Sequence, residues 1–133
     1  MPPESAFPSI LWFNSLARQV NSDPDYLKAA HTLNARVAFA VGGCETVVLT
    51  LLNGKVVGIE KCEGLRGTDY RLEGPEEGWD LFWQERVNFP WATNQMYGKL
   101  RIKGNIVMAA GDSWALANLC RRFRQVPKEG VLQ

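Results

Sequence analysis

Hydrophobic residues follow two different periods along this chain, and the change from one to the other separates helical from strand-forming segments. From Ser9 to about Val20, apolar residues recur every three or four positions, which predicts a helix whose first turn Ser9 caps. Asp23 followed by Pro24 predicts the start of a second helix. From Arg36 onward, apolar and polar residues alternate, which is the pattern of a strand with one buried face.

The alternation of apolar and polar residues continues through four predicted strands, which are separated by turn residues. The first covers residues 36–41 and leads through two glycines into a strand with the sequence ETVVLTLL. Asn53 and Gly54 then predict a tight hairpin, because both central residues of that turn need positive φ. The third strand reads KVVGIEKCEG, and the fourth, residues 68–74, reads TDYRLEG.

Helices return before and after one further strand. Pro75 and the two glutamates that follow it predict the start of a helix, and Pro90 ends it. Residues 99–103 predict a fifth strand that arrives after a helical crossover, so that parallel pairing with an earlier strand is open to it. Asp112 then caps a last helix, in which Leu116, Leu119, Cys120 and Phe123 are spaced to form one apolar face. These elements predict an α+β fold, in which helices cover one face of a five-stranded, mainly antiparallel sheet with an apolar pocket between them.

Large aromatic side chains gather in the segment 79–104. An aromatic helix-turn-helix that closes over a sheet builds an apolar pocket, but the same clustering also builds an ordinary core, and the pattern leaves both interpretations open. Phe89 and Trp91 flank Pro90 in a turn that we interpret as a lid, with Trp91 or Tyr97 holding the polar group of a ligand. The predicted lining residues are Phe39, Phe82, Trp83, Phe89, Trp91, Met96, Tyr97, Leu116 and Leu119.

Length and charge predict a single globular domain over residues 1–133. We expect a core over about residues 10–124 and a tail over 125–133. Apolar residues make up 46% of the chain and charged residues 22%, as in soluble globular proteins. The net charge of +1 excludes the broad basic surface that nucleic-acid binding requires.

Cysteine use and the N-terminal segment predict a cytoplasmic protein. Cys44, Cys62 and Cys120 are odd in number and widely spaced, which favours free thiols in a reducing compartment over disulfides or a zinc site. The first residues lack a basic segment, and their apolar run is too short for a signal peptide or a membrane span.

Signatures of known catalytic and metal sites are absent from the sequence. It has no G-x-S-x-G, P-loop, H-x-x-x-H or G-x-G-x-x-G motif, and one histidine with three scattered cysteines offers no metal-ligand spacing. His31 is on the apolar side of the second predicted helix, where a packed, hydrogen-bonded imidazole is the usual role. Asp80 and Glu85 are five positions apart, so they do not share a helix face for paired acid–base work. We therefore predict no catalytic residue, no metal and no cofactor.

Cations alternate along the fifth predicted strand. Lys99, Arg101 and Lys103 face outward there, and arginines gather again at residues 121–124. A solvated outer face is the interpretation that we favour for these groups. Contact with a phosphate, with a membrane surface, or with an anionic head group such as a carboxylate or coenzyme A is left open.

Three motifs in a fixed order carry a resemblance to a known family. The strands ARVAFAV and ETVVLTLLNGKVVGIEKCEG come first, TDYRLEG then runs into the helix PEEGWDLFW, and GKLRIKGN precedes the last helix. The last of these motifs is similar to a Gly-Lys-Leu-x-Ile-x-Gly-Asp element of the sterol carrier protein type 2 family, the nonspecific lipid-transfer fold. Over about residues 10–123 the chain resembles that family.

The resemblance implies both a fold and a function. Family members have a five-stranded, largely antiparallel sheet covered on one side by helices, with an apolar tunnel between, and they bind fatty acids, acyl-CoA, sterols or other hydrophobic molecules. The chain departs from this pattern at Asn105, where the family commonly has Asp, and in the segment ERVNFPWATNQMY, which replaces a turn. It also ends without a peroxisomal address. These departures indicate a bacterial-type relative with a ligand of its own.

Three functional hypotheses remain. The leading one is a carrier that binds a small hydrophobic ligand in an apolar tunnel without covalent chemistry. The second is a small enzyme of isomerase or hydratase type, in which His31, Asp80 or Tyr97 acts as acid or base. The third is an interaction domain whose aromatic surface meets a protein partner. The predicted partner is a hydrophobic small molecule and not a nucleic acid, while a membrane surface and a homodimer are left open.

Overall fold

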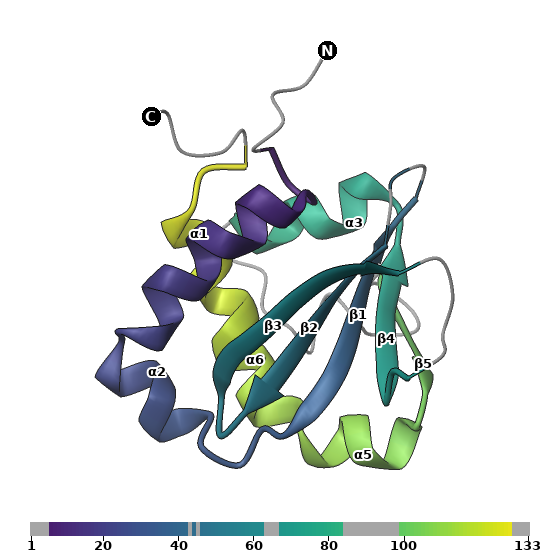
Figure 1. Ribbon diagram of the computed structural model, residues 1–133. Helices are drawn as coiled ribbons and strands as arrows, with labels where there is room; N and C mark the ends of the chain where they lie inside the picture. Colours follow the sequence, from purple (N-terminus) through teal and green to yellow (C-terminus); the bar gives the residue numbers. More distant parts are fainter. Residues whose placement is uncertain (1–5, 43, 45, 63–66, 84–98, 129–133) are drawn as a thin grey trace.

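A five-stranded sheet with helices on one of its faces makes up the protein (Figure 1). The computed structural model describes residues 6–42, 44, 46–62, 67–83 and 99–128. The strands lie in the order β3-β2-β1-β4-β5 and have the bounds β1 Ala35–Val41, β2 Thr46–Leu52, β3 Lys55–Cys62, β4 Tyr70–Gly74 and β5 Arg101–Gly104. The helices are α1 Ile10–Asn21, α2 Pro24–Ala29, α3 Glu76–Asp80, α5 Ile106–Gly111 and α6 Ser113–Arg121, with 3-10 turns η1 Leu81–Trp83 and η2 Arg122–Gln125. The predicted α+β class is confirmed.

The sheet is mixed, and its parallel pair is not where the sequence left room for one. β1 pairs with β2, β2 with β3 and β4 with β5 in antiparallel fashion. β4 instead runs parallel to β1, with Leu72 opposite Phe39. The sequence assigned the option of parallel pairing to the fifth strand, and this is corrected. The reason is topological. After β3 the chain does not turn back beside that strand but crosses to the far side of β1, and there it enters β4 in the same direction as β1.

The predicted hairpin between β2 and β3 is confirmed and is anchored to α2. Asn53 and Gly54 have φ values of 52° and 86°, as a turn of this type requires. The carbonyl oxygen of Gly54 accepts a 2.7 Å hydrogen bond from the buried hydroxyl of Tyr26. A Cβ at Gly54 would lie 2.7 Å from the backbone oxygen of Ala30, so any larger residue would push the hairpin away from α2.

Side-chain caps begin the first two helices, as predicted. Ser9 accepts from the amide of Trp12, and Asp23 accepts from the amide of Tyr26. Asp112 precedes α6 as expected, but its side chain makes no capping bond. Its carboxylate instead accepts a 2.7 Å hydrogen bond from the hydroxyl of Tyr70, which joins β4 to the junction of α5 and α6.

Both ends of the described chain pack against the core beyond the limits expected from the sequence. Phe7 is buried, and its amide donates to the carbonyl of Lys128 at 2.8 Å. Val126 is buried as well, although it falls in the predicted tail. Lys128 forms ion pairs with Glu76 and Asp80 of α3. Residues 126–128 therefore belong to the packed structure. The carbonyl and the ammonium group of Lys128 have partners in distant segments, which the sequence pattern does not reveal.

His31 lies at the protein surface and not on a buried helix face. α2 ends at Ala29, so the helical spacing that placed His31 on the apolar side does not reach it. The imidazole is exposed, and its Nδ1 lies 2.8 Å from the carbonyl oxygen of Lys28.

No helix in the described part of the chain combines the length and hydropathy that crossing a membrane requires.

Asp23 connects α2 to the C-terminal turn η2, and this predicts a pH-dependent part of the stability. Its carboxylate accepts from the amide of Tyr26 and, at 3.0 Å, from Nε of Arg122. These bonds lower the pKa of Asp23 in the folded state. A carboxyl with a depressed folded pKa stabilises the protein above its unfolded pKa, and that stability is lost as the pH falls through the folded pKa.

Asp23→Asn keeps an oxygen for capping but removes the charge. Urea unfolding should show that the variant is less stable than the wild type at pH 7 and that the difference shrinks at pH 3. Asp25→Asn, in the same first turn, is the matched control and should show a smaller difference at pH 7. Equal effects of the two substitutions would contradict the role of the Arg122 contact.

Candidate functional site

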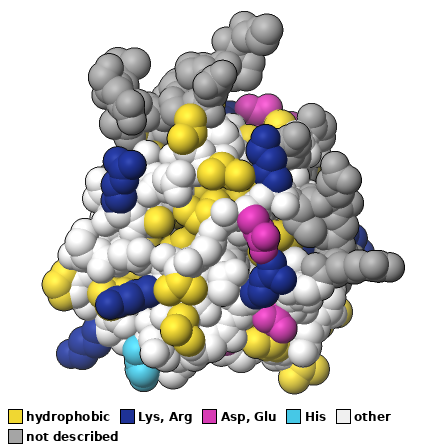
Figure 2. Space-filling view, viewed as in Figure 1, with side chains coloured by type: hydrophobic (Ala, Val, Ile, Leu, Met, Phe, Trp, Pro, Cys, Tyr) yellow, Lys and Arg dark blue, Asp and Glu magenta, His cyan; other side chains and the backbone are white. Residues whose placement is uncertain are grey.

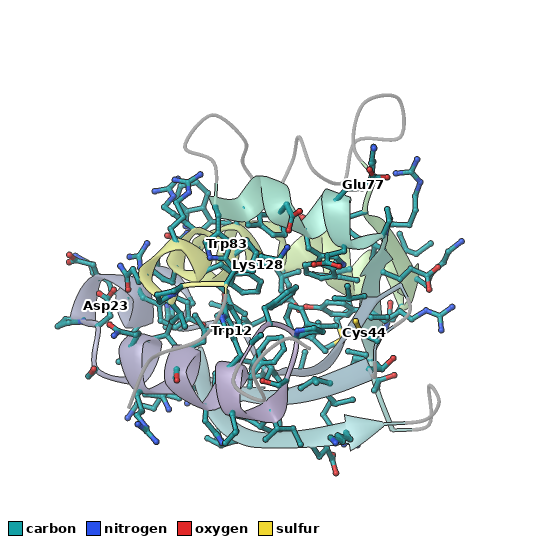
Figure 3. All side chains as sticks on the ribbon, turned by 90° about the horizontal axis from the view of Figure 1, so that it is seen from above. Trp12, Asp23, Cys44, Glu77, Trp83 and Lys128 are labelled. Atoms are coloured by element: carbon teal, nitrogen blue, oxygen red, sulfur yellow. The ribbon has the colours of Figure 1, made fainter. Side chains whose placement is uncertain are left out.

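Eight aromatic rings meet in the space between the helices and the sheet, and we call them the aromatic cluster. Neighbouring ring centroids lie between 4.8 and 6.5 Å apart, and edge-to-face pairs are common among them. Figure 3 looks down on this interior and shows Trp12 and Trp83 within it. The members are Phe7, Trp12, Phe13, Phe39, Trp79, Phe82, Trp83 and Phe123.

Phe123 is the ring on which the cluster is centred. It is fully buried and contacts each of the other seven rings. It projects from η2, directly after the helix for which the sequence predicted Leu116, Leu119, Cys120 and Phe123 as one apolar face. The partners come from α1 and the residues before it, from β1, and from α3 with η1. Segments distant in sequence are thus joined by one side chain.

The structure brings several of the predicted lining residues together. Phe39, Phe82 and Trp83 are members of the aromatic cluster, and Leu116 and Leu119 are fully buried in α6. Among the described residues these side chains pack against a common core. The predicted residues Phe89, Trp91, Met96 and Tyr97 lie outside the described residues, so their place in the lining, and the lid at Phe89 and Trp91, stay predictions.

Sequence reasoning missed about half of the cluster. The cluster members that were not among the predicted lining residues are Phe7, Trp12, Phe13, Trp79 and Phe123, and all of these except Trp79 lie near the two ends of the chain, far in sequence from the dense segment 79–104. The available signal was weak: the apolar faces of the first and last helices indicate burial but not which rings they meet.

The tryptophans of the cluster differ in how their indole N–H groups are satisfied. Nε1 of Trp12 donates to the carbonyl of Pro127 at 2.9 Å, and Nε1 of Trp83 donates to the carbonyl of Val126 at 2.9 Å. Trp79 is fully buried, and its Nε1 has no acceptor among the described residues. Two of the three donors therefore hold the C-terminal segment in place, and one remains available.

Ionisable groups that border the core are held in their neutral forms. Burial raises the pKa of Tyr70, and its hydrogen bond to Asp112 raises the pKa further. Burial also raises the pKa of the Cys120 thiol and that of Tyr26. Groups with such shifts donate hydrogen bonds or pack, and they do not act as bases near neutral pH. Cys44 and Cys120 are free thiols, as the sequence predicted for them.

The acid–base residues of the enzyme hypothesis are not assembled in the described structure. His31 is exposed at the end of α2, whereas Asp80 belongs to α3, and Figure 1 shows these helices at different ends of the molecule. Asp80 is ion-paired with Lys128. Partial burial lowers the pKa of Lys128, but the bonds to Asp80 and Glu76 outweigh it, so the pKa of this lysine is raised. Tyr97 lies outside the described residues.

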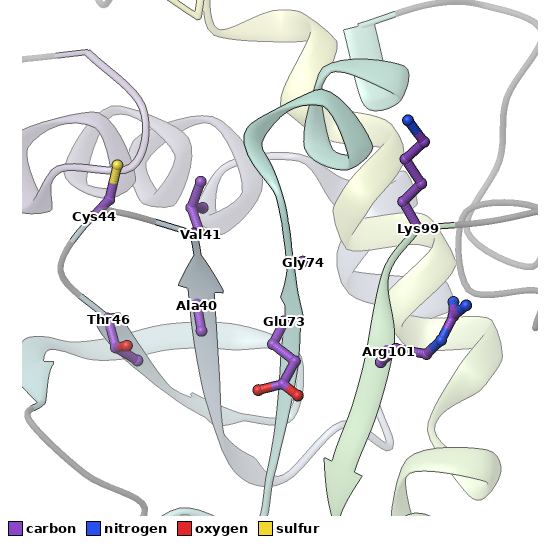
Figure 4. A pocket seen from close by; sticks show the side chains of 9 residues that line it. Ala40, Val41, Cys44, Thr46, Glu73, Gly74, Lys99 and Arg101 are labelled. Atoms are coloured by element: carbon purple, nitrogen blue, oxygen red, sulfur yellow. The ribbon is translucent and has the colours of Figure 1, made fainter.

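A separate groove of about 410 Å³ opens on the helix-free face of the sheet (Figure 4). Ala40 is paired with Glu73, and Glu73 with Arg101, so these side chains share the face opposite Phe39 and Leu72. Figure 4 shows Lys99 and Arg101 directed away from Glu73. The lining residues are Ala40, Val41, Gly42, Cys44, Thr46, Glu73, Gly74, Lys99 and Arg101.

Two charged side chains of this groove form ion pairs with residues outside its lining. Lys99 forms a 3.0 Å ion pair with Glu77, and Arg71 forms one of 2.9 Å with Glu73. The outward stripe of cations predicted for the fifth strand is present, and pairing of this kind is typical of a solvated outer face. Charged and apolar side chains both line the groove, whereas Phe39 and Leu72 lie on the opposite face, in the core.

Solved structures identify the fold. No family model and no curated protein matches the chain. The crystal structure of a sterol carrier protein 2 superposes with a TM-score of 0.72 at 27% identity, over 87% of this chain and 95% of that one. The chain has the sterol carrier protein 2 fold. The resemblance found in the sequence is thereby confirmed at the level of the fold.

Two further structures agree with this fold. The solution structure of a conserved hypothetical protein from Thermus thermophilus, whose name suggests a sterol carrier protein, gives a TM-score of 0.70 at 27% identity, over 86% of this chain and 85% of that one. Sterol carrier protein 2 from Yarrowia lipolytica, in its apo form, gives 0.57 at 19% identity, over 92% and 98% of the two chains. At that identity the second likeness concerns the fold alone.

The central position of Phe123 predicts a large stability cost for its removal. Phe123→Ala should lower the free energy of unfolding by about 3–5 kcal/mol, because it leaves a cavity and removes one contact from each of the other seven rings. Trp114→Ala is the control: Trp114 is a large aromatic residue that is mostly exposed, and its removal should change stability by about 0.5 kcal/mol or less. Urea midpoints measure both, and a loss below about 1 kcal/mol for Phe123→Ala would contradict the packing described.

Proposed function

We propose that this protein is a carrier for a small hydrophobic ligand, such as a fatty acid, acyl-CoA, a sterol or a similar lipid. The observation that carries the proposal is the aromatic cluster, which occupies the space between helices and sheet in a sterol carrier protein 2 fold. One of the solved structures is named as a sterol carrier protein 2 at 27% identity, which supports the same class of function here.

Apolar contact supplies the binding energy in this proposal. Each Å² of ligand surface removed from water contributes roughly 25 cal/mol before the entropic costs of association are subtracted. We propose that Phe39, Phe82 and Trp83 contact the ligand from the sheet and η1, and that Leu116 and Leu119 contact it from α6. Because Phe39, Phe82 and Trp83 each pack against Phe123 in the described structure, these rings must separate for a ligand to enter between them. Phe89, Trp91, Met96 and Tyr97 complete the proposed lining.

A carrier is favoured over an enzyme by the state of the polar groups. The buried tyrosines and the buried thiol have raised pKa values, and Asp80 is engaged with Lys128. An isomerase or hydratase needs an acid and a base at one substrate, and His31 and Asp80 do not share a site. Binding through shape and apolar contact needs no such pair.

We also propose that one end of the molecule contacts an anionic membrane surface, from which a carrier collects its ligand. Leu52, Ile106, Val107 and Trp114 are 55–84% exposed. Figure 1 places α5, the start of α6 and the β2–β3 hairpin at the end opposite the chain termini, and Figure 2 shows hydrophobic side chains along this edge. Exposed aromatic and aliphatic residues of this kind insert at the level of lipid head groups.

Charge favours a lipid surface over a second copy of the chain at this end. Lys55 and Lys103 are exposed in the same hairpin and at the end of β5. The carboxylates nearest to α5 are occupied internally: Asp69 accepts from the amide of Arg36 and Asp112 from Tyr70. Two copies would bring like charges together, whereas anionic lipids attract each nearby lysine by about 1 kcal/mol.

Ligand binding predicts a change in tryptophan emission. Methyl dodecanoate, a neutral long-chain acyl probe, should bind with micromolar affinity and shift the emission of the buried indoles, and it should raise the melting temperature because it binds only the folded state. The Trp114→Phe variant serves as the control, since it removes an exposed indole and leaves the interior ones as reporters. If fatty acids, acyl-CoA, sterols and aromatic hydrophobes all leave emission and melting temperature unchanged, the carrier function is wrong.

Membrane contact predicts binding to vesicles that depends on lipid charge and salt. The protein should cosediment with phosphatidylserine-containing vesicles at low salt and much less with pure phosphatidylcholine or at high salt. Trp114→Ala should weaken this binding several-fold, while Leu11→Ala, which removes an exposed apolar residue of α1, should not. Equal losses for the two variants would place the contact elsewhere, and a dimer that Trp114→Ala abolishes would assign this end to a second copy.

A further inference from the structure

Trp79 carries a buried hydrogen-bond donor that no group in the described part of the protein satisfies. Its side chain is 0% exposed, and its Nε1 has no acceptor there. Buried polar groups are hydrogen-bonded in the large majority of cases, and each exception needs a reason. Trp12 and Trp83, in the same cluster, follow the rule through the carbonyls of Pro127 and Val126. The exception is therefore specific to one indole.

The described surroundings of Trp79 offer no strong acceptor to this donor. Phe7, Phe39 and Phe82 lie with ring centroids 5.7–5.8 Å from it, and Phe123 is stacked on it at 6.5 Å with an interplanar angle of 12°. Aromatic faces are only weak partners for an N–H group. A phenylalanine at this position would fill much of the same space without burying an unpaired donor, so packing alone does not account for the indole.

We infer that Nε1–H of Trp79 donates to an oxygen atom of the bound ligand and so selects ligands with a hydrogen-bond acceptor on an otherwise apolar body. This inference rests on the proposed carrier function and specifies its ligand class. The bond stabilises the complex twice: it adds a hydrogen bond, and it relieves the cost of an unsatisfied donor in the free protein. A pure hydrocarbon would gain apolar contact only.

The chemistry of the site favours an uncharged acceptor. An indole N–H is a single neutral donor, and it is surrounded by aromatic rings. A carboxylate buried there would lose its hydration shell and gain only one hydrogen bond in return, and this exchange is strongly unfavourable. A hydroxyl, an ester carbonyl or a ketone loses far less. The ligand class is thus a long-chain or polycyclic alcohol, ester or ketone.

The effect on the free protein provides the first test. Trp12→Phe removes a donor that is bonded to Pro127, whereas Trp79→Phe removes the unsatisfied one. Both substitutions shrink a buried indole to a phenyl ring, so the volume change is matched. The urea midpoint should therefore fall more for Trp12→Phe than for Trp79→Phe. An equal or larger fall for Trp79→Phe would show that Trp79 is an ordinary packing residue and would overturn the inference.

The decisive test measures binding of 1-dodecanol. Trp79→Phe should lower the affinity for this alcohol by roughly tenfold, which corresponds to the loss of one buried hydrogen bond. Trp114→Phe makes the same substitution at an exposed position and should leave the affinity unchanged. In the wild type, the indole N–H resonance of Trp79 in ¹H–¹⁵N spectra should move downfield when 1-dodecanol is added. This readout decides the question even if Trp79→Phe does not fold.

The outcomes separate this inference from the carrier function itself. Wild-type protein that binds dodecanoic acid but not 1-dodecanol remains a carrier, and the inference is overturned. The inference is also overturned if 1-dodecanol binds Trp79→Phe as tightly as the wild type, or if the Trp79 resonance does not move downfield. If 1-dodecanol, fatty acids, acyl-CoA, sterols and aromatic hydrophobes all fail to bind, the carrier function fails, and the inference fails with it.

Discussion

The packing of Phe123 against the rest of the aromatic cluster is the interaction on which the structure depends most. This ring comes from the last turn of the described chain, yet it touches rings of α1, β1, α3 and η1. Aromatic pairs at these distances add to the free energy gained from burial alone. A core centred in this way ties the covering helices to the middle of the sheet.

Hydrogen bonding complements this packing at the C-terminal end. The carbonyls of Val126 and Pro127 accept from the indoles of Trp83 and Trp12, so the segment after η2 covers the cluster and satisfies two buried donors. Lys128 extends the same connection to α3 through Glu76 and Asp80. Among the indoles of the described cluster, only that of Trp79 has a donor left without a partner.

The two faces of the sheet have different roles. The inner face presents Phe39 and Leu72 to the helices, while the outer face carries charged side chains, among them Glu73, which pairs with Arg71 beside an open groove. Buried tyrosines and the buried thiol remain neutral because burial raises their pKa values. We propose that a hydrophobic ligand binds between helices and sheet, and that the exposed apolar residues at the α5 end contact a membrane surface.

Local features of this fold could be predicted from the sequence because they depend on neighbouring residues. Ser9 and Asp23 cap helices by reaching amides three positions away, and Asn53 with Gly54 forms a turn through its own backbone angles. Alternation assigned the faces of the strands, since a strand has a period of two. The apolar faces of strands and helices and the density of aromatic residues predicted an interior position for five side chains, and the structure has them in or against the core: Phe39, Phe82, Trp83, Leu116 and Leu119.

Long-range pairing was decided only by the tertiary structure. Nothing near β4 in the sequence states that it lies beside β1, and nothing near His31 states that α2 stops two residues before it. Phe123 could be assigned to a buried face, but the rings that it contacts, such as Phe7 and Phe39, lie far from it in the sequence. Whether an indole finds an acceptor depends on carbonyls more than forty residues away, as for Trp83 and Val126. Sequence patterns predict which side chains are buried, whereas the identity of each buried partner follows from how the layers pack.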